Sequence, residues 1–597
     1  MNDTPRAERG RPISLRERIL GPNLRHAALA IGLLLVLGVV LIWPLLEVVL
    51  AGFQRSDGRF TSEYLRLVLS NPVVTRGLLK ATLIASATTG VALALALPLA
   101  VLASRYEFRG RELLSSLVLA PIVLPPFVGA IGMRSLLGRF GPLTQLLGQG
   151  EGSGVDWLGT LRVFGVVAVE ALALYPIIFL NLRAALANVD PLLERAAANR
   201  GATRWAVLRR VTFPLVRPGL FAGCTLVFIW SFTELGTPLM FHVYDVTPVQ
   251  VFIQIVEVDN PLPYALVVVM LVGTSLLYVL GKVLFGRAIR VTGSKAAALS
   301  ALHPLHGLRA LLAALPLVLV LLLALLPHVS VLLTSVSATG AWYRSIVPRA
   351  FTGAHFVSAL REDLVMPVAG HGPLQLGAVG NSIVYAGLAT LLGALMACCI
   401  ALIVARSRVP WRGVLDVLSV LPLAVPGLVM AFGYLSISVQ CRRLFGDATP
   451  AWLDVQRFPV VLLVVAYATR RLPYVVRSAV AGLQQVPEDY ERAAANLGAS
   501  WARVLWRIVL PLVFASLLAG ALMAFVFAML EVSDSLILAQ SARYFPITRA
   551  IWELSQRLGD GLYVASALGV WAMALLMLTL LLASTLLGRK LGAMFRP

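Results

Sequence analysis

Four carboxylates lie in strongly apolar stretches of this sequence, and they are the residues best placed to act on a charged ligand. They are Glu170, Glu234, Glu531 and Asp534. Acidic side chains in such stretches usually face a cavity or a polar partner, because burying a lone charge is costly. We therefore predict that they line a polar path that favours a cation. Capping of helix ends by solvated carboxylates is the alternative interpretation.

The sequence lacks the motifs that bind nucleotides, form disulfides or hold a metal. No GxxxxGK[ST] run is present that could cradle a nucleotide phosphate, since Gly281-Lys282 is followed by Val283 inside an apolar stretch. Four cysteines lack the spacing of a disulfide framework or a metal site and read as small core residues: Cys224, Cys398, Cys399 and Cys441. We expect no catalytic site, no metal and no cofactor on this chain.

The composition indicates that the elements holding these acids are membrane helices. The chain has 597 residues, of which 59% are apolar and 13% charged. About 20 apolar residues cross a bilayer, and many stretches reach that length, among them Ala27–Phe53, Ala81–Ser104, Leu311–Val336 and Ile383–Ala405. We predict an all-α polytopic membrane protein of about twelve spans. The short alternating segments of a membrane β-barrel do not occur.

The net charge of +21 could suggest a nucleic-acid partner, but the positions of the basic residues argue against it. Arginines gather in short segments between spans, for example Arg195–Arg217 and Arg470–Arg507, and these segments alternate with less basic ones. This bias is typical of cytoplasmic loops and of contact with anionic lipid. It predicts a multi-pass membrane protein with both termini in the cytoplasm, and no nucleic-acid partner.

An internal repeat organises the chain. Residues 194–220 and 491–517 are identical at 15 of 27 positions without a gap, at an offset of 297. The same offset pairs Glu234 with Glu531, but it pairs Glu170 with Tyr467. We predict two homologous halves, residues 1–295 and 296–597, each with about six spans. An even number of spans gives both halves the same orientation, so a path between them is expected.

The repeated segments are loop 1 (residues 189–214) and loop 2 (residues 486–511). Each begins with an Ala-rich helix that a glycine ends, and a second short helix then leads to a proline at the start of the next span. Their alanines form a small-residue face that another protein could approach closely. Two such faces in the cytoplasm predict a two-fold partner. Amphipathic helices lying on lipid are the alternative.

The pattern resembles the EAA loop of permeases in bacterial ABC importers. The matching residues are Glu194, Ala196, Ala197, Gly201 and Pro214 in loop 1, and Glu491, Ala493, Ala494, Gly498 and Pro511 in loop 2. An arginine is inserted after each glutamate, and Phe213 stands where leucine is usual, yet the spacing to the glycine and the proline is kept. The resemblance covers most of the chain, as two fused permease domains of the binding-protein-dependent family with the MetI-like type I fold.

This resemblance implies a mechanism and partners. Each loop would dock in one copy of a cytoplasmic ABC ATPase subunit, and ATP-driven closure of the two copies would switch the permease between inward-open and outward-open states. Hydrolysis would take place on that separate subunit. A periplasmic or lipid-anchored binding protein would deliver the substrate.

The sequence leaves alternatives open for the transported substrate and for the class of transporter. The segments 232–241 and 530–539 are most similar to those of ferric-iron permeases, while permeases for thiamine, 2-aminoethylphosphonate, polyamines and sulfate are close cousins. A different class is a secondary transporter coupled to an ion gradient, with Glu170, Glu234 and Glu531 as proton sites. The duplicated loops argue against that class, because an ion-driven carrier has no need to dock an ATPase.

Overall fold

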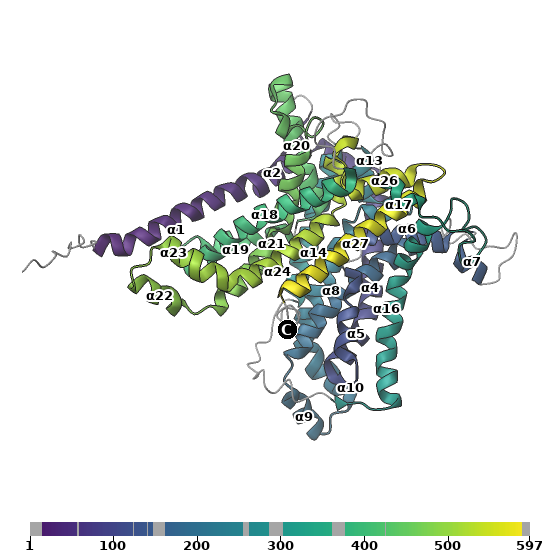
Figure 1. Ribbon diagram of the computed structural model, residues 1–597, viewed down its shortest axis with the longest axis horizontal. Coiled ribbons are helices and arrows are strands. Elements are labelled where there is room, and N and C mark those ends of the chain that lie inside the picture. The colour runs from purple at the N-terminus through teal and green to yellow at the C-terminus, as the bar shows by residue number, and fades with distance from the viewer. Residues whose placement is uncertain are drawn as a thin grey trace, which may run out of the picture. The chain divides into compact units, whose positions relative to one another are not determined.

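The computed structural model describes residues 15–55, 59–122, 125–139, 141–146, 162–254, 262–285, 303–360, 377–423 and 425–587 (Figure 1). The predicted division between residues 295 and 296 lies outside these ranges. The chain forms two compact units. Unit 1 takes Met1–Ile42, Thr390–Leu423 and Ala468–Ala524, and unit 2 takes Trp43–Ala389, Ala424–Tyr467 and Phe525–Pro597.

Unit 2 holds most of the helices (Figure 1). Its elements up to residue 285 are α2 (Trp43–Gly52), α3 (Glu63–Ser70), α4 (Pro72–Arg105), β1 (Tyr106–Glu107), α5 (Arg111–Leu117), η2 (Ala120–Ile122), α6 (Pro126–Leu137), α7 (Pro142–Leu146), α8 (Arg162–Ala187), α9 (Pro191–Asn199), α10 (Arg204–Val207), η3 (Leu208–Thr212), α11 (Phe213–Phe232), α12 (Gly236–Met240), α13 (Thr247–Ile253) and α14 (Leu262–Phe285). Its later elements are β2 (His303–Pro304), which pairs in parallel with β1, then α16 (Leu308–Val336), α17 (Ala354–Ser358), α20 (Gly427–Phe445), η7 (Gly446–Ala448), η8 (Ala451–Leu453), α25 (Ser533–Leu538), η10 (Ala542–Tyr544), α26 (Ile547–Gln556) and α27 (Gly561–Leu587).

Unit 1 is built around loop 2. It contains α1 (Leu15–Leu37), η1 (Gly38–Ile42), α19 (Arg412–Val420), η6 (Leu421–Leu423), α22 (Glu488–Asn496), α23 (Trp501–Val504) and η9 (Leu505–Val509). The later parts of α18 (Gly377–Arg406) and α21 (Val460–Gln485), and most of α24 (Leu510–Met529), complete it.

The all-α polytopic prediction is confirmed. Among the described residues, eight helices are long and apolar enough to cross a membrane, and ten if each of two interrupted pairs is counted as one span. A shorter apolar helix, Leu262–Leu277, adds to these. The interruptions fall after η2 and η6, directly before or at Pro125 and Pro426. Helices are required here because a bilayer offers backbone groups no water as a hydrogen-bonding partner.

The first span of each sequence half packs against the other half. In unit 1, Leu33 and Leu37 of α1 share a buried cluster with Ile400 of α18 and Val475 of α21. In unit 2, α16 lies against α6 of the first half. The two halves are thus interlocked through their first spans, which the repeat alone did not predict.

Glycines allow these crossings. A Cβ atom added to Gly132 of α6 would overlap the carbonyl oxygen of Pro327 in α16, and one added to Gly433 of α20 would lie 2.5 Å from the carbonyl oxygen of Pro44 in α2. The repeat pairs Gly132 with Gly433. The same proline-on-glycine contact therefore fixes the first span of each half, at matched places in the two halves.

Gly132→Ala tests this contact. The added methyl group has no room beside the Pro327 carbonyl, so we expect a loss of about 1–3 kcal/mol of stability, as for other overpacked sites. Thermal unfolding of the purified protein in detergent measures it. Gly90→Ala in α4 is the control, because nothing lies within 4 Å of a Cβ there. Equal melting temperatures for the two variants would contradict the proposed close contact.

Candidate functional site

Loop 1 has the geometry that its sequence predicts for the first helix. The Asp190 side chain caps α9 by accepting a hydrogen bond of 2.9 Å from the Leu192 amide. Gly201 ends the helix at a φ of 83°, in the left-handed region that glycine adopts without strain. The Gly201 amide donates to the Ala198 carbonyl and the Ala202 amide to the Ala197 carbonyl. This pair of bonds is the Schellman arrangement of helix ends.

Loop 2 repeats this geometry in unit 1. Gly498 follows α22 at a φ of 82°, and the amides of Gly498 and Ala499 donate to the carbonyls of Ala495 and Ala494. The two loops share the glycine conformation and both bonds although they lie in different units. The turn is therefore a property of the repeated sequence and does not depend on its surroundings.

The predicted second short helix is wrong in one respect. Residues 205–211 and 501–510 do not form separate helices, because each runs through a π-helical turn, η3 or η9, directly into the next span. The prolines are the physical reason. Pro214 and Pro511 follow these turns and lack the amide that a regular helix would use, so the wider turn absorbs the missing bond.

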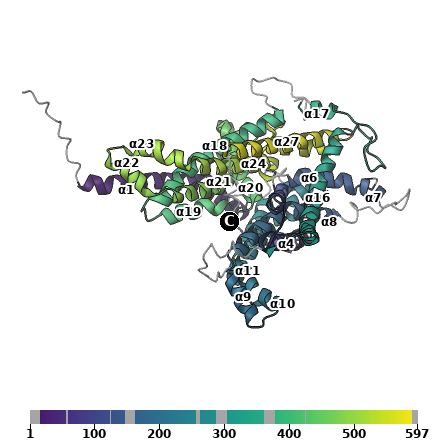
Figure 2. The same ribbon diagram turned by 60° about the horizontal axis from the view of Figure 1, so that its bottom comes forward.

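Both alanine faces are open to a partner. Every residue of α9 and α22 reaches the surface at least in part, with Ala196 and Ala493 exposed and Ala197 and Ala494 half-buried. Large apolar side chains beside them are exposed too, Trp205 to 69% and Leu497 to 89%. Exposed apolar surface of this kind marks a contact region. Figure 2 shows α9 and α10 beyond the end of α11 in unit 2.

The glutamate of each loop points back into the protein. Arg105, the last residue of α4, donates two hydrogen bonds of 2.6 and 2.5 Å to the Glu194 carboxylate. Thr212 Oγ1 donates a third, of 2.5 Å. Burial on its own would raise the pKa of Glu194, but these hydrogen bonds and the Arg105 charge outweigh it and lower the pKa below its ordinary value. The pair therefore breaks at a lower pH than one made by a glutamate with an ordinary pKa.

Glu491 has a matching arginine. Arg406, the last residue of α18, donates from Nε to Glu491 at 2.8 Å and from Nη2 to the carbonyls of Leu483 and Val486 at 3.0 and 2.7 Å. Neither Arg105 nor Arg406 was predicted from the sequence. Their offset of 301, which also relates Pro121 to Pro422, is the signal that could have found them.

Glu234 and Glu531 lie just past the ends of spans, not inside them. Helix α11 ends at Phe232 and α24 at Met529. Each carboxylate accepts a long hydrogen bond from an amide of the short helix that follows, Glu234 from Thr237 at 3.4 Å and Glu531 from Asp534 at 3.5 Å. These contacts resemble the helix capping of the alternative interpretation, but Glu531 is only 4% exposed and is not a solvated carboxylate, so both roles stay proposals.

Like Glu531, the other two acids are deeply buried. Glu170 in α8 is 1% exposed and accepts hydrogen bonds from Ser231 and from Thr88, the latter at 3.3 Å. Asp534 at the start of α25 is fully buried. At the position that pairs with Glu170, Tyr467 donates to Ser535 at 3.3 Å. Each half therefore has a buried acid beside its shared glutamate, but at a different position of the repeat.

The acids flank a contact between the two sequence halves within unit 2. A Cβ at Gly236, two residues after Glu234, would lie 2.9 Å from Val532, the neighbour of Glu531. Further along, the rings of Phe252 and Trp552 meet edge to face with centroids 6.5 Å apart. Symmetry-related segments thus meet next to their glutamates, and the structure brings the first-half and second-half acids into one region.

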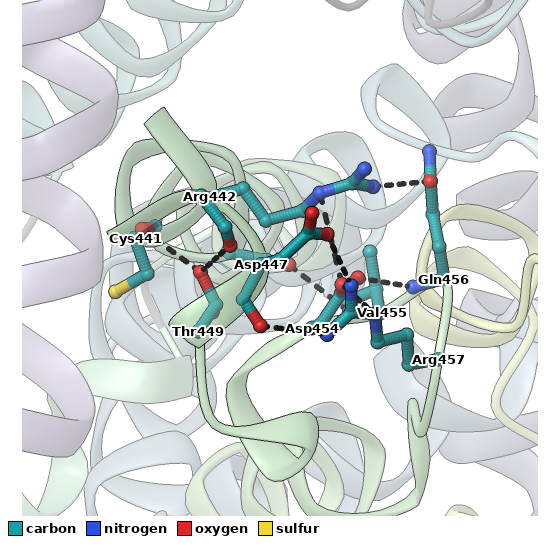
Figure 3. A network of polar contacts seen from close by, with 10 residues as sticks. Cys441, Arg442, Asp447, Thr449, Asp454, Val455, Gln456 and Arg457 are labelled. Carbon is teal, nitrogen blue, oxygen red and sulfur yellow. Dashed lines mark hydrogen bonds and ion pairs between the residues drawn. The ribbon is translucent and has the colours of Figure 1, made fainter. Parts of the chain in front are cut away.

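Ion pairs connect the residues of the loop between α20 and α21 in unit 2. Between α20 and α21, Asp454 is 1% exposed and forms ion pairs with Arg442 and Arg457, and Arg457 also binds Asp447 at 2.8 Å (Figure 3). The Thr449 hydroxyl donates to the Cys441 carbonyl at 3.1 Å. Figure 1 shows the far end of α20 and loop 1 at opposite ends of the unit.

Comparison with known proteins gives two matches to one family. The family model of the binding-protein-dependent transport system inner membrane component matches residues 96–291 and 389–595. A Haemophilus influenzae protein named as a ferric transport system permease, FbpB 1, is 27% identical over 85% of this chain and 77% of its own length. The ferric transport system permease protein FbpB of Actinobacillus pleuropneumoniae is 26% identical over 94% and 78%. The molybdenum transport system permease protein ModB of Escherichia coli is 33% identical, over 27% of this chain and 71% of its own length.

Gly498→Ala tests the turn of loop 2. Space is open around Gly498, so the cost comes from the left-handed φ alone and should be about 1–2 kcal/mol. We expect amide hydrogen exchange across residues 488–499 to rise about five- to thirty-fold. Gly413→Ala in α19 is the control, because it has open space and no positive φ. Unchanged exchange in Gly498→Ala would refute the requirement for glycine.

Proposed function

The chain belongs to the family of binding-protein-dependent transport system inner membrane components, and we propose that it carries ferric iron across the inner membrane. The chain is the permease of an ABC importer. Iron is proposed because the ferric permeases match it over most of its length, whereas the E. coli molybdenum permease matches 27% of it. We further propose that residues 1–295 and 296–597 are two fused permease halves.

ATP hydrolysis on two copies of a cytoplasmic ATPase subunit would drive transport, one copy at each loop. The open alanine faces of α9 and α22 support this proposal, as does their identical helix-ending turn. Small side chains let a partner's backbone approach closely, and Trp205 and Leu497 add apolar area beside them. This docking requires the loops to lie in the cytoplasm, and we propose that both chain termini lie there too.

A substrate-binding protein would deliver the ion at the opposite face. The ion pairs of Asp454 fix the shape of the loop after α20, and Phe445 and Trp452 on it are more than half exposed. A preformed surface loses little conformational freedom on binding. We propose that this loop is part of the surface that receives the binding protein.

The path for the ion would pass the acids between the halves. Glu234, Glu531 and Asp534 lie beside the contact of Gly236 with Val532, and Glu170 joins Thr88 of α4 to Ser231 of α11. Carboxylate and hydroxyl oxygens are the ligands that hard cations prefer. These four residues are therefore proposed to lower the barrier for a cation, while the binding protein selects it.

Bulky residues in the alanine faces test docking. We expect Ala196→Trp combined with Ala493→Trp to abolish copurification of the ATPase, because the indole rings keep its backbone away from α9 and α22. Ala451→Trp, an exposed alanine in the loop after α20, is the control and should retain the ATPase. Full retention in the double variant would argue against docking at the loops.

Glu234→Gln combined with Glu531→Gln tests the path. Glutamine keeps an oxygen that can cap the following helix but removes the charge, so we expect ferric-ion uptake to fall at least tenfold with an unchanged melting temperature. Glu112→Gln, an exposed carboxylate in α5, should not change uptake. Normal uptake by the double variant would reduce these glutamates to helix caps.

A further inference from the structure

We propose that Arg105 and Arg406 are positioning residues that fasten each ATPase-docking loop to the end of a long helix, so that movement of the loop moves the helix. This inference rests on the proposed function. It assigns a role to two residues outside both loops, and it gives the loop glutamates an internal partner.

The loop glutamates point toward the protein and not toward solvent. The Glu194 side chain is 16% exposed and that of Glu491 is 25% exposed, although both stand on helices that are otherwise open to solvent. The two bonds from Arg105 to Glu194 form the fork that arginine makes with carboxylates. These carboxylates thus face the protein, while the alanines beside them face outward.

Each arginine joins several structural elements. Arg105 holds α9 through Glu194, which also holds η3 through Thr212. Arg406 holds α22 through Glu491 and the end of α21 through two backbone carbonyls. Its side chain is 12% exposed. An isolated surface ion pair contributes little, but a pair that connects three elements restrains how the loop can move.

The arginine–glutamate pair occurs in both halves. The arginine ends the long helix that precedes its loop in each sequence half, α4 in the first and α18 in the second. The secondary contacts differ, with a threonine hydroxyl in one half and backbone carbonyls in the other. The shared part is the arginine–glutamate pair, so the pair is the feature that both loops require.

The Arg105–Glu194 pair connects loop 1 to the whole length of helix α4. It has 34 residues and is therefore about 51 Å long. Thr88, about 25 Å from Arg105 along the axis, donates to Glu170, and Lys80, about 37 Å away, binds Asp245 at 2.7 Å. A displacement of loop 1 applied at Arg105 would move a continuous helix that contacts a buried acid of the proposed path.

The test uses the complete complex with its ATPase and binding protein, reconstituted in liposomes. Arg105→Ala and Arg406→Ala should still copurify with the ATPase and hydrolyse ATP, but the amount of ferric ion transported per ATP should fall at least tenfold. Arg109→Ala and Arg408→Ala are the matched controls, because these exposed arginines lie close to the same helix ends. The controls should keep the wild-type ratio of transport to hydrolysis.

A charge exchange separates linkage from folding. Arg105→Glu alone should uncouple transport, and its combination with Glu194→Arg should restore at least part of the ratio. A wild-type ratio in both alanine variants would overturn the proposal, and so would loss of the ATPase from them, since the arginines would then only shape the docking face. Variants that fail to fold and are not rescued by the exchange would also overturn it. If the wild-type permease itself bound no ATPase, the proposed function would fail instead.

Discussion

Close approach of helices at glycine is the constraint on which the rest of this structure depends. In a bilayer the hydrophobic effect does not drive helices together, so packing and small residues must. Gly132 against Pro327 and Gly433 against Pro44 bring the first span of each half onto the other half. Gly223 against Ile178 and Gly520 against Val475 bring α8 to α11 and α21 to α24. The same contacts occur in both halves, so the repeat is a repeat of packing as well as of sequence.

This packing supports the proposal that movement at the loops is passed on to the membrane spans. The interlocked spans hold the segments of Glu234 and Glu531 next to each other in unit 2. Helix α4 is continuous from Thr88, which donates to buried Glu170, to Arg105, which binds Glu194 of loop 1. Helix α4 thus joins the Arg105–Glu194 pair at its end to Thr88 and Glu170 further along. Rigid secondary elements of this kind can carry coupling between two sites.

Sequence reasoning captured the parts that depend on neighbouring residues. The first helix of each loop and the glycine turns at Gly201 and Gly498 follow from local preferences. The exchange of first spans between halves could not be found, because it depends on contacts between residues about 200 or more positions apart, such as Gly132 with Pro327. Glu234 was expected inside a span because a continuous helix from Pro214 would reach it after about 30 Å, but helix α11 ends at Phe232. The missed arginines follow the offset of 301 and not that of 297, because the halves differ in length between these segments.

The most direct test of the account is uptake of ferric ion into liposomes that contain the purified permease, with loaded binding protein outside and ATP inside. The account predicts ATP-dependent uptake only when the ATPase subunit is present, and no uptake in its absence under a proton or sodium gradient. Uptake driven by such a gradient without the ATPase would contradict it.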